Sequence, residues 1–195
     1  MKPISVSMLT ICGLEELDLH GSRGVTHVLS ILDPDRADPE AFLDYGTHHR
    51  TSLRFHDVIG PRPGYIAPER AHVEEILAFG NDLFATAQAV EPHLLVHCHA
   101  GISRSTAAMA MLMAQAEPSL DASSLYERLR QVRPRAWPNS RMIAFADEAL
   151  GRGGELTAAL GTLYRRQLID YPNVRAYMRD NGRIEEVEMA DAAGG

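Results

Sequence analysis

One stretch, residues 94–105, constrains this chain more than any other. A short apolar run leads into Cys98, five residues separate Cys98 from Arg104, and a long apolar segment follows. The run Leu94–Val96 predicts a buried strand, and residues 106–114, apolar on every face, predict a helix deep in the core. The loop between them then lies where backbone N–H groups are unpaired and the helix dipole favours an anion.

The residues of this loop suit an ionised thiol beside a tetrahedral oxyanion. A helix N-terminus and a nearby arginine can lower the pKa of Cys98 from about 8.5 to roughly 3.5–7.5. Gly101 lets the loop curl so that its N–H groups point inward as an anion nest. The fork of Arg104 can bind two phosphate oxygens, and Ser103 and Ser105 add hydroxyls that can hydrogen-bond the sulfur or the loop.

The pattern His97-Cys98-x-x-Gly101-x-x-Arg104-Ser105 resembles the signature of the cysteine-dependent protein tyrosine phosphatases. Its fuller form, His-Cys-x-Ala-Gly-x-Ser-Arg-Ser, is most similar to the dual-specificity branch and its compact bacterial relatives. The alternative is a buried structural cysteine with an unrelated arginine nearby. Five specified positions in a strand–loop–helix context favour the phosphatase loop.

The resemblance implies two-step covalent catalysis, in which Cys98 attacks phosphorus and a cysteinyl phosphate is then hydrolysed. His97 would order the loop and favour the thiolate, and Ser105 would stabilise that thiolate as a leaving group. No metal or cofactor is required. The substrate phosphate would be held by residues 99–104: His99, Ala100, Gly101, Ile102, Ser103 and Arg104.

Asp57 is the predicted general acid, because it follows a predicted strand and opens an irregular loop that contains two glycines and two prolines. The resemblance also puts the acid just after the strand that precedes the long helix. A strand-end turn residue is the alternative interpretation, and Asp82, the nearby rival, falls inside a helical stretch. The gap from Asp57 to Cys98 is longer than is usual in compact members, so residues 60–68 are interpreted as an inserted lid.

Hydrophobic periodicity predicts an alternation of strands and helices. Strands are expected at residues 4–8, 25–32, 51–55 and 94–96. Helices are expected at residues 13–20 and 41–45, and from an N1 proline at residue 68 to about residue 89. Three more are expected: one that begins at residue 104, one that follows an N-cap at Asp121, and one that runs from an N-cap at Asn139 to about residue 150.

The resemblance covers about residues 1–150 and implies an α/β three-layer sandwich, a mostly parallel sheet of four or five strands between helices. Family members often carry an Arg-Pro…Pro-Asn segment beneath the catalytic loop, as at residues 133–139, yet Arg133 and Arg135 could equally be solvated. Residues 151–154 predict a flexible break, and residues 151–195 a C-terminal helical extension with a loose end from residue 189. Its apolar stripe suits packing on the domain or a homodimer contact equally.

Composition limits the partners and the compartment. The net charge of −7 argues against nucleic acid, and no segment predicts a membrane span or a signal peptide. Two cysteines exclude a disulfide framework and suit a reducing, cytoplasmic location. The sequence therefore predicts a cytoplasmic protein tyrosine phosphatase.

The expected substrate is a phosphorylated protein, with phosphotyrosine favoured and phosphoserine or phosphothreonine as further substrates. A phosphoinositide phosphatase would need extra cations, and the variable loop positions hold no lysine. A phosphoprotein-binding pseudophosphatase would keep the pocket without the chemistry, although Cys98, Arg104 and Asp57 are all present. A rhodanese-like sulfurtransferase would not need this cysteine-to-arginine spacing, and a metal site at residues 97–99 lacks further ligands in the sequence.

Overall fold

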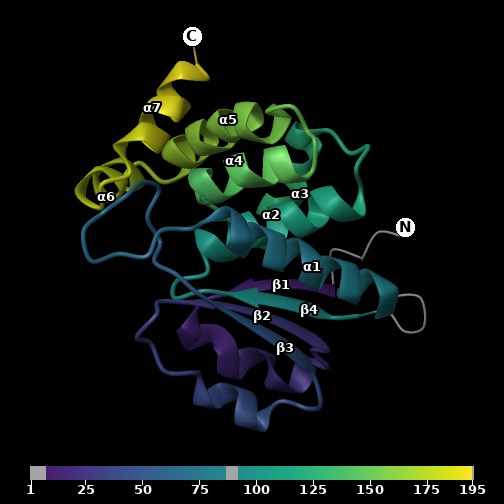
Figure 1. Ribbon diagram of the computed structural model, residues 1–195. Coiled ribbons are helices and arrows are strands. Elements are labelled where there is room, and N and C mark those ends of the chain that lie inside the picture. The colour runs from purple at the N-terminus through teal and green to yellow at the C-terminus, as the bar shows by residue number, and fades with distance from the viewer. Residues whose placement is uncertain (1–7, 87–91, 195) are drawn as a thin grey trace.

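The computed structural model describes residues 8–86 and 92–194, and a parallel sheet lies at its centre (Figure 1). The sheet has four strands in the order β1-β4-β2-β3, and every neighbouring pair is parallel. The strands are β1 (Leu9–Cys12), β2 (His27–Leu32), β3 (His49–Arg54) and β4 (Leu94–His97). Because all four run the same way, the loops that follow them emerge at one edge of the sheet, where ligands bind in open α/β folds.

In the part of the chain that the structure describes, seven α-helices lie on one side of this sheet and two short 3-10 helices lie on the other (Figure 1). The predicted three-layer α/β fold is thus confirmed, and the layer that the 3-10 helices form is thin. The α-helices are α1 (Arg70–Thr86), α2 (Arg104–Ala116), α3 (Ala122–Val132), α4 (Ser140–Ala149), α5 (Glu155–Asp170), α6 (Val174–Asp180) and α7 (Ile184–Ala192). The 3-10 helices are η2 (Leu14–Arg23) and η3 (Glu40–Asp44).

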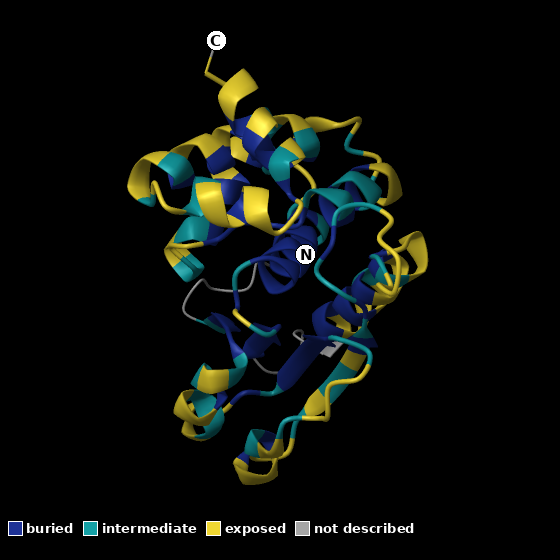
Figure 2. Ribbon diagram, turned by 90° about the vertical axis from the view of Figure 1, so that its left-hand side faces the viewer, coloured by how far each residue is buried: buried dark blue, intermediate teal, exposed yellow. Residues whose placement is uncertain are grey.

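Alternation along the strands divides the apolar side chains between two cores. Leu29, Leu94 and Val96 face the α-helices and join the large core, whereas Val28 and Leu95 face the 3-10 helices and join the small one. Helix α2 lies inside the large core and packs against α1, α3, α4 and the sheet. The interior helices and strands are coloured as buried and the outer faces of the C-terminal helices as exposed in Figure 2. The prediction that the segment after Arg104 is a central buried helix is confirmed.

The C-terminal residues pack back on the domain. Helix α5 contacts α3, α4 and α7, and its apolar stripe is buried there at Leu156, Leu160, Leu163 and Tyr164. The expectation of a loose end from residue 189 is wrong for residues 189–192, which form the last turn of α7. The homodimer contact remains a prediction.

Other boundaries differ modestly from the sequence prediction. Helix α1 begins at Arg70 rather than at the proline at position 68, and the strand expected at residues 4–8 falls mostly outside the described residues. The Asp121 and Asn139 caps are confirmed, since each side chain accepts a hydrogen bond from a backbone N–H in the first turn of its helix. Within residues 8–86 and 92–194, no helix combines the length and the apolar character that crossing a bilayer requires.

Candidate active site

The loop after β4 curls between the strand and the start of α2. Ser103 is the N-cap of α2, and Gly101 adopts a φ of 67°. A Cβ on Gly101 would lie 2.4 Å from the backbone carbon of Cys12 at the end of β1. Glycine is therefore required twice, for the left-handed backbone and for the close approach to the neighbouring strand end.

Cys98 lies at the bottom of this loop with Ser105 beside it. The Sγ of Cys98 is 3.2 Å from the Oγ of Ser105, and the cysteine is only 3% exposed. His97 is fully buried, and its Nε2 lies 2.6 Å from the Oγ of Ser30 on β2. Burial lowers the pKa of His97 to about 4. His97 is therefore neutral at physiological pH and can act on the loop by hydrogen bonding but not by charge.

Arg104 lies in the first turn of α2, buried beside the loop. Its Nη1 donates to a carboxylate oxygen of Asp33 at 2.7 Å and to the carbonyl of Phe55 at 2.5 Å. Its Nε is buried and has no hydrogen-bond partner among the described residues. An oxyanion in the loop would supply that partner. Asp33 follows β2, and its contact with Arg104 is a site feature that the sequence analysis missed.

Asp57 follows β3 and points toward the same loop. It accepts hydrogen bonds from Ser103 Oγ at 2.7 Å and from Asn139 Nδ2 at 2.9 Å, while Nη1 of Arg183 lies 3.2 Å from each carboxylate oxygen. Burial alone would raise the pKa of Asp57, but Arg183 and Arg104 and the two hydrogen bonds lower it below its usual value. The resting side chain is therefore an anchored carboxylate.

The segment at residues 133–139 supports the loop from below. Arg133 donates from Nε to the carbonyl of Gly101 at 3.0 Å and from Nη2 to that of Ala100 at 3.1 Å. It also forms two hydrogen bonds with Glu16, at 2.9 and 2.8 Å. The backbone N–H of Trp137 donates to the carbonyl of Ile102 at 2.9 Å. Arg133 is thus a structural support of the loop rather than a solvated side chain.

A cavity of about 520 Å³ opens above Cys98. Its floor is formed by residues of the catalytic loop and by Asp57, and its outer wall comes from the C-terminal helices. The wall residues include Tyr171, Val174, Tyr177, Met178 and Arg183. Chain segments far apart in sequence thus enclose one hollow that is lined by a thiol, three guanidinium groups and a carboxyl group.

Comparison with known proteins agrees with this geometry. Residues 65–151 match the family model described as "Protein-tyrosine phosphatase". A curated relative, Dual specificity protein phosphatase 12 of Rattus norvegicus, is 31% identical over 114 residues, which is 56% of this chain and 32% of the relative. The chain is therefore similar to protein-tyrosine phosphatases over residues 65–151, and to a dual specificity phosphatase over 114 residues.

Solved phosphatases share the fold. The crystal structure of human DUSP28 superposes with a TM-score of 0.55 at 16% identity and covers 78% of this chain and 99% of that one. A mouse putative dual specificity phosphatase, crystallised as a zinc tungstate complex, gives a TM-score of 0.56 at 15% identity, with 82% and 93% covered. The chain spans about a third of the length of the curated relative it matches.

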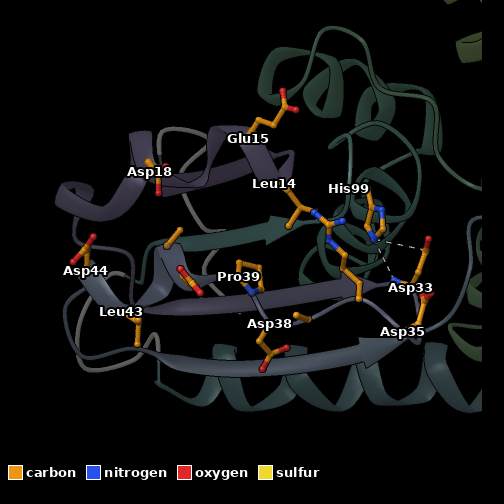
Figure 3. A pocket seen from close by; sticks show the side chains of 14 residues that line it. Leu14, Glu15, Asp18, Asp33, Asp35, Asp38, Pro39, Leu43, Asp44 and His99 are labelled. Atoms are coloured by element: carbon orange, nitrogen blue, oxygen red, sulfur yellow. Dashed lines mark hydrogen bonds and ion pairs between the residues drawn. The ribbon is translucent and has the colours of Figure 1, made fainter.

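The protein has a second, larger hollow on the other side of His99 (Figure 3). Nε2 of His99 accepts a hydrogen bond from the Asp33 N–H at 3.2 Å and lies 3.7 Å from its carboxylate. Most of the other charged residues around this hollow are acidic: Glu15, Asp18, Asp35, Asp38, Glu40 and Asp44, with Arg36 as the exception. A phosphate dianion would be repelled there, so the hollow above Cys98 is the one that suits phosphate.

The candidate site thus gathers the sequence-predicted residues Cys98, Arg104, Ser105 and Asp57, with His97 behind the loop. No group of three His, Cys, Asp or Glu residues in the described part of the chain could hold a metal ion. The loop at residues 60–68 folds back on the end of β3 through hydrogen bonds between His56 and Ile66. Its role as a lid remains a prediction.

Arg183 is the functional residue that the sequence analysis missed most completely. It lies at the start of α7, beyond the region that resembles the family, in a segment with no motif. The only available signal was a basic side chain among other basic and acidic residues, which is too common to assign a role.

Proposed function

We propose that this protein hydrolyses phosphate monoesters on proteins, phosphotyrosine above all, through a cysteinyl-phosphate intermediate. One observation carries the proposal: Cys98, Arg104 and Asp57 line a single cavity, together with other residues of the loop that joins Cys98 to Arg104. A thiol, an oxyanion clamp and a carboxyl group are the three parts that this chemistry needs.

In the first step, the thiolate of Cys98 attacks phosphorus from the bottom of the loop. A sulfur–phosphorus bond forms while the bond from phosphorus to the tyrosine oxygen breaks. The N–H groups of residues 99–104 and the guanidinium of Arg104 stabilise the charge on the three equatorial oxygens. The buried Nε of Arg104 gains the partner it otherwise lacks.

Asp57 supplies the proton that the departing phenoxide takes. In the free protein Arg183 and Arg104 favour its carboxylate form. A bound phosphate dianion brings negative charge to the same pocket and raises the pKa of Asp57 toward the protonated form. The acid is therefore most effective below neutral pH, and substrate binding itself promotes its protonation.

The second step reverses the proton's direction. Asp57, now a carboxylate, accepts a proton from water as that water attacks phosphorus. The sulfur–phosphorus bond breaks, and inorganic phosphate leaves. The departing thiolate of Cys98 accepts the hydrogen bond of the Ser105 hydroxyl, 3.2 Å away, which stabilises it as a leaving group.

The walls of the cavity favour an aromatic phosphate ester. Tyr171, Val174, Tyr177 and Met178 surround its mouth, and Cys98 lies 3% exposed at its floor. A phenyl ring both bridges that depth and packs on such side chains, whereas a serine phosphate is short and offers little apolar surface. The charged headgroup of a phosphoinositide would gain less from these apolar neighbours.

The proposal is tested by turnover of matched phosphotyrosine, phosphoserine and phosphothreonine peptides and a panel of phosphoinositides. We expect release of phosphate fastest from phosphotyrosine and none from Cys98→Ser, which should still bind vanadate or tungstate because the loop is intact. Cys12→Ser is the matched control. Binding of phosphopeptides without turnover by the wild type would instead identify a pseudophosphatase, and preferred phosphoinositide turnover would overturn the substrate class.

A further inference from the structure

Arg183 joins the C-terminal segment to the catalytic carboxyl group. Its Nη1 lies 3.2 Å from both oxygens of Asp57 and donates to Ser103 Oγ at 2.7 Å. Ser103 in turn donates to Asp57 at 2.7 Å and caps α2, the helix that carries Arg104. The Arg183 side chain is 5% exposed. One buried guanidinium therefore contacts both the proposed acid and the catalytic loop.

Glu186, one turn further along α7, fixes the other side of the guanidinium. Arg183 donates to it from Nε at 2.7 Å and from Nη2 at 2.8 Å. Glu186 is completely buried and also accepts hydrogen bonds from Trp137 Nε1 at 2.7 Å and from the Ser140 N–H at 2.9 Å. Because a bidentate fork has one orientation, the third nitrogen is aimed at Asp57.

Several charged groups face this pair from other elements. Asp57 experiences Arg183 from α7, Arg104 from α2 and His99 from the catalytic loop. Arg183 experiences Asp57 from the loop after β3, Glu186 on its own helix and the buried Tyr164 from α5. Arg183 thus faces two carboxylates, that of the proposed acid Asp57 and that of the buried Glu186.

We propose that Arg183 is a positioning residue for the phosphatase reaction, which holds the Asp57 carboxyl group above the catalytic loop and makes the C-terminal helices part of the active site. This inference rests on the proposed function, because it assigns Asp57 as the acid. Its placement follows from the contacts above: without Arg183, the hydrogen-bond donors that Asp57 keeps among the described residues are Ser103 and Asn139.

The arrangement has two opposite effects on the reaction. The contact fixes the direction from which Asp57 approaches the leaving oxygen, which raises kcat. The positive charge also favours the carboxylate form, so it makes proton donation less available as the pH rises. Loss of Arg183 should therefore change the shape of the pH profile as well as its height, and a merely structural role would not change the shape.

The test measures kcat and kcat/KM on a phosphotyrosine peptide against pH for Arg183→Gln. We expect kcat to fall by up to about 10²-fold through misplacement of the acid. We also expect the alkaline limb of kcat/KM to move upward by roughly one pH unit, because the carboxyl group is protonated more easily. The fall should shrink for an aryl phosphate whose leaving group is a stable anion.

Further variants serve as controls for effects of the substitution on folding. The double variant Arg183→Gln with Glu186→Gln removes both charges of the buried pair, so that no unpaired charge is left buried at position 186. It should fold and show the same displaced alkaline limb. Arg183→Lys keeps the positive charge and should restore the wild-type limb while recovering only part of kcat. Arg175→Gln, which loses an exposed ion pair with Asp191 in the same segment, is the matched control and should behave as wild type.

The outcomes separate this inference from the proposed function. The role of Arg183 alone is overturned by a combination of two results. The wild type turns over phosphotyrosine with Cys98 as nucleophile, while a folded Arg183→Gln or double variant shows an unchanged alkaline limb and an unchanged leaving-group dependence. A wild type that binds vanadate but turns over no phosphate ester overturns the proposed function and this inference with it. A displaced limb together with partial recovery by Arg183→Lys supports the inference.

Discussion

Nη1 of Arg104 donates to the carboxylate of Asp33 at 2.7 Å, so the arginine of the catalytic loop faces a fixed negative charge before any phosphate binds. The two residues lie 71 positions apart and meet because β2 and β4 are parallel neighbours whose following loops share one edge of the sheet. Asp33 holds the guanidinium in place, yet its charge also opposes that of an incoming dianion.

Asp33→Asn should separate these two effects. We expect vanadate to bind several-fold more tightly, because a negative charge beside the anion is gone, and kcat to fall by up to ~10²-fold, because Arg104 is less firmly oriented. Vanadate inhibition constants and steady-state kinetics measure both. Asp35→Asn, an exposed acidic neighbour in the same turn, is the control. Unchanged kcat with unchanged vanadate affinity would show that Asp33 has no influence on the site.

The two cysteines should differ sharply in reactivity. Burial, and secondarily Glu16, raises the pKa of Cys12 to about 12, so this thiol is unreactive at neutral pH. Cys98 lines the open cavity beside Arg104 and should react with iodoacetamide at pH 7. Brief treatment with peroxide should also oxidise Cys98, and a thiol reductant should reverse this oxidation. Mass spectrometry of the labelled protein locates the modification. Equal labelling of both thiols would show that the loop does not activate Cys98.

Local features of the sequence predicted the centre of the site well. The residues from Leu94 to Ser105 are contiguous, so strand, loop and helix follow from apolar runs, a glycine and the helix N-terminus without knowledge of distant partners. Asp57 could be predicted because position after a strand is also a local property. The structure brings it to the loop through Ser103, with which it shares a hydrogen bond.

The partners of these residues could not be predicted, because the contacts span large sequence separations. Glu16 and Arg133 are 117 residues apart, and Asp57 and Arg183 are 126 residues apart. Periodicity tells which face of a helix is buried but not which side chain it meets. The end of α7 was misread for a related reason: its small and acidic residues suggest a loose terminus, whereas packing against α5 and α6 stabilises the helix.

The contact between Glu16 and Arg133 should affect both stability and activity, because Arg133 also supports the catalytic loop. Arg133→Met removes two hydrogen bonds to loop carbonyls and two to Glu16, and we expect the free energy of unfolding to fall by about 1–3 kcal/mol. Glu16→Gln should cost less, because it keeps an acceptor. Denaturant unfolding of both single variants and the double variant gives the coupling energy.

In Arg133→Met, kcat should also fall, since the carbonyls of Ala100 and Gly101 lose the donor that fixes the loop. Arg130→Met on α3, which loses ion pairs with Glu127 and Asp170 rather than hydrogen bonds to the loop, is the matched control. Strict additivity of the two single variants in the unfolding experiment would contradict the proposed support.

Asp57→Asn tests the proposed acid directly. We expect kcat on phosphotyrosine substrates to fall by roughly 10²–10⁴-fold, because the amide cannot donate the required proton. The loss should be much smaller for an aryl phosphate whose leaving group is already a stable anion. KM should change little, and any change should be toward tighter binding, since a negative charge beside the dianion is removed.

The direction in which activity changes with pH tests the role of Asp57 as the acid. Arg183 and Arg104 lower the pKa of Asp57 despite its burial, so in the free enzyme the acid form is present at low pH and is lost as the pH rises. The wild-type kcat/KM should therefore fall on the alkaline side at an unusually low pH, and Asp57→Asn should lose that limb. Asp82→Asn, exposed on α1, is the control and should retain it. If wild type and Asp57→Asn show the same leaving-group dependence, another residue donates the proton.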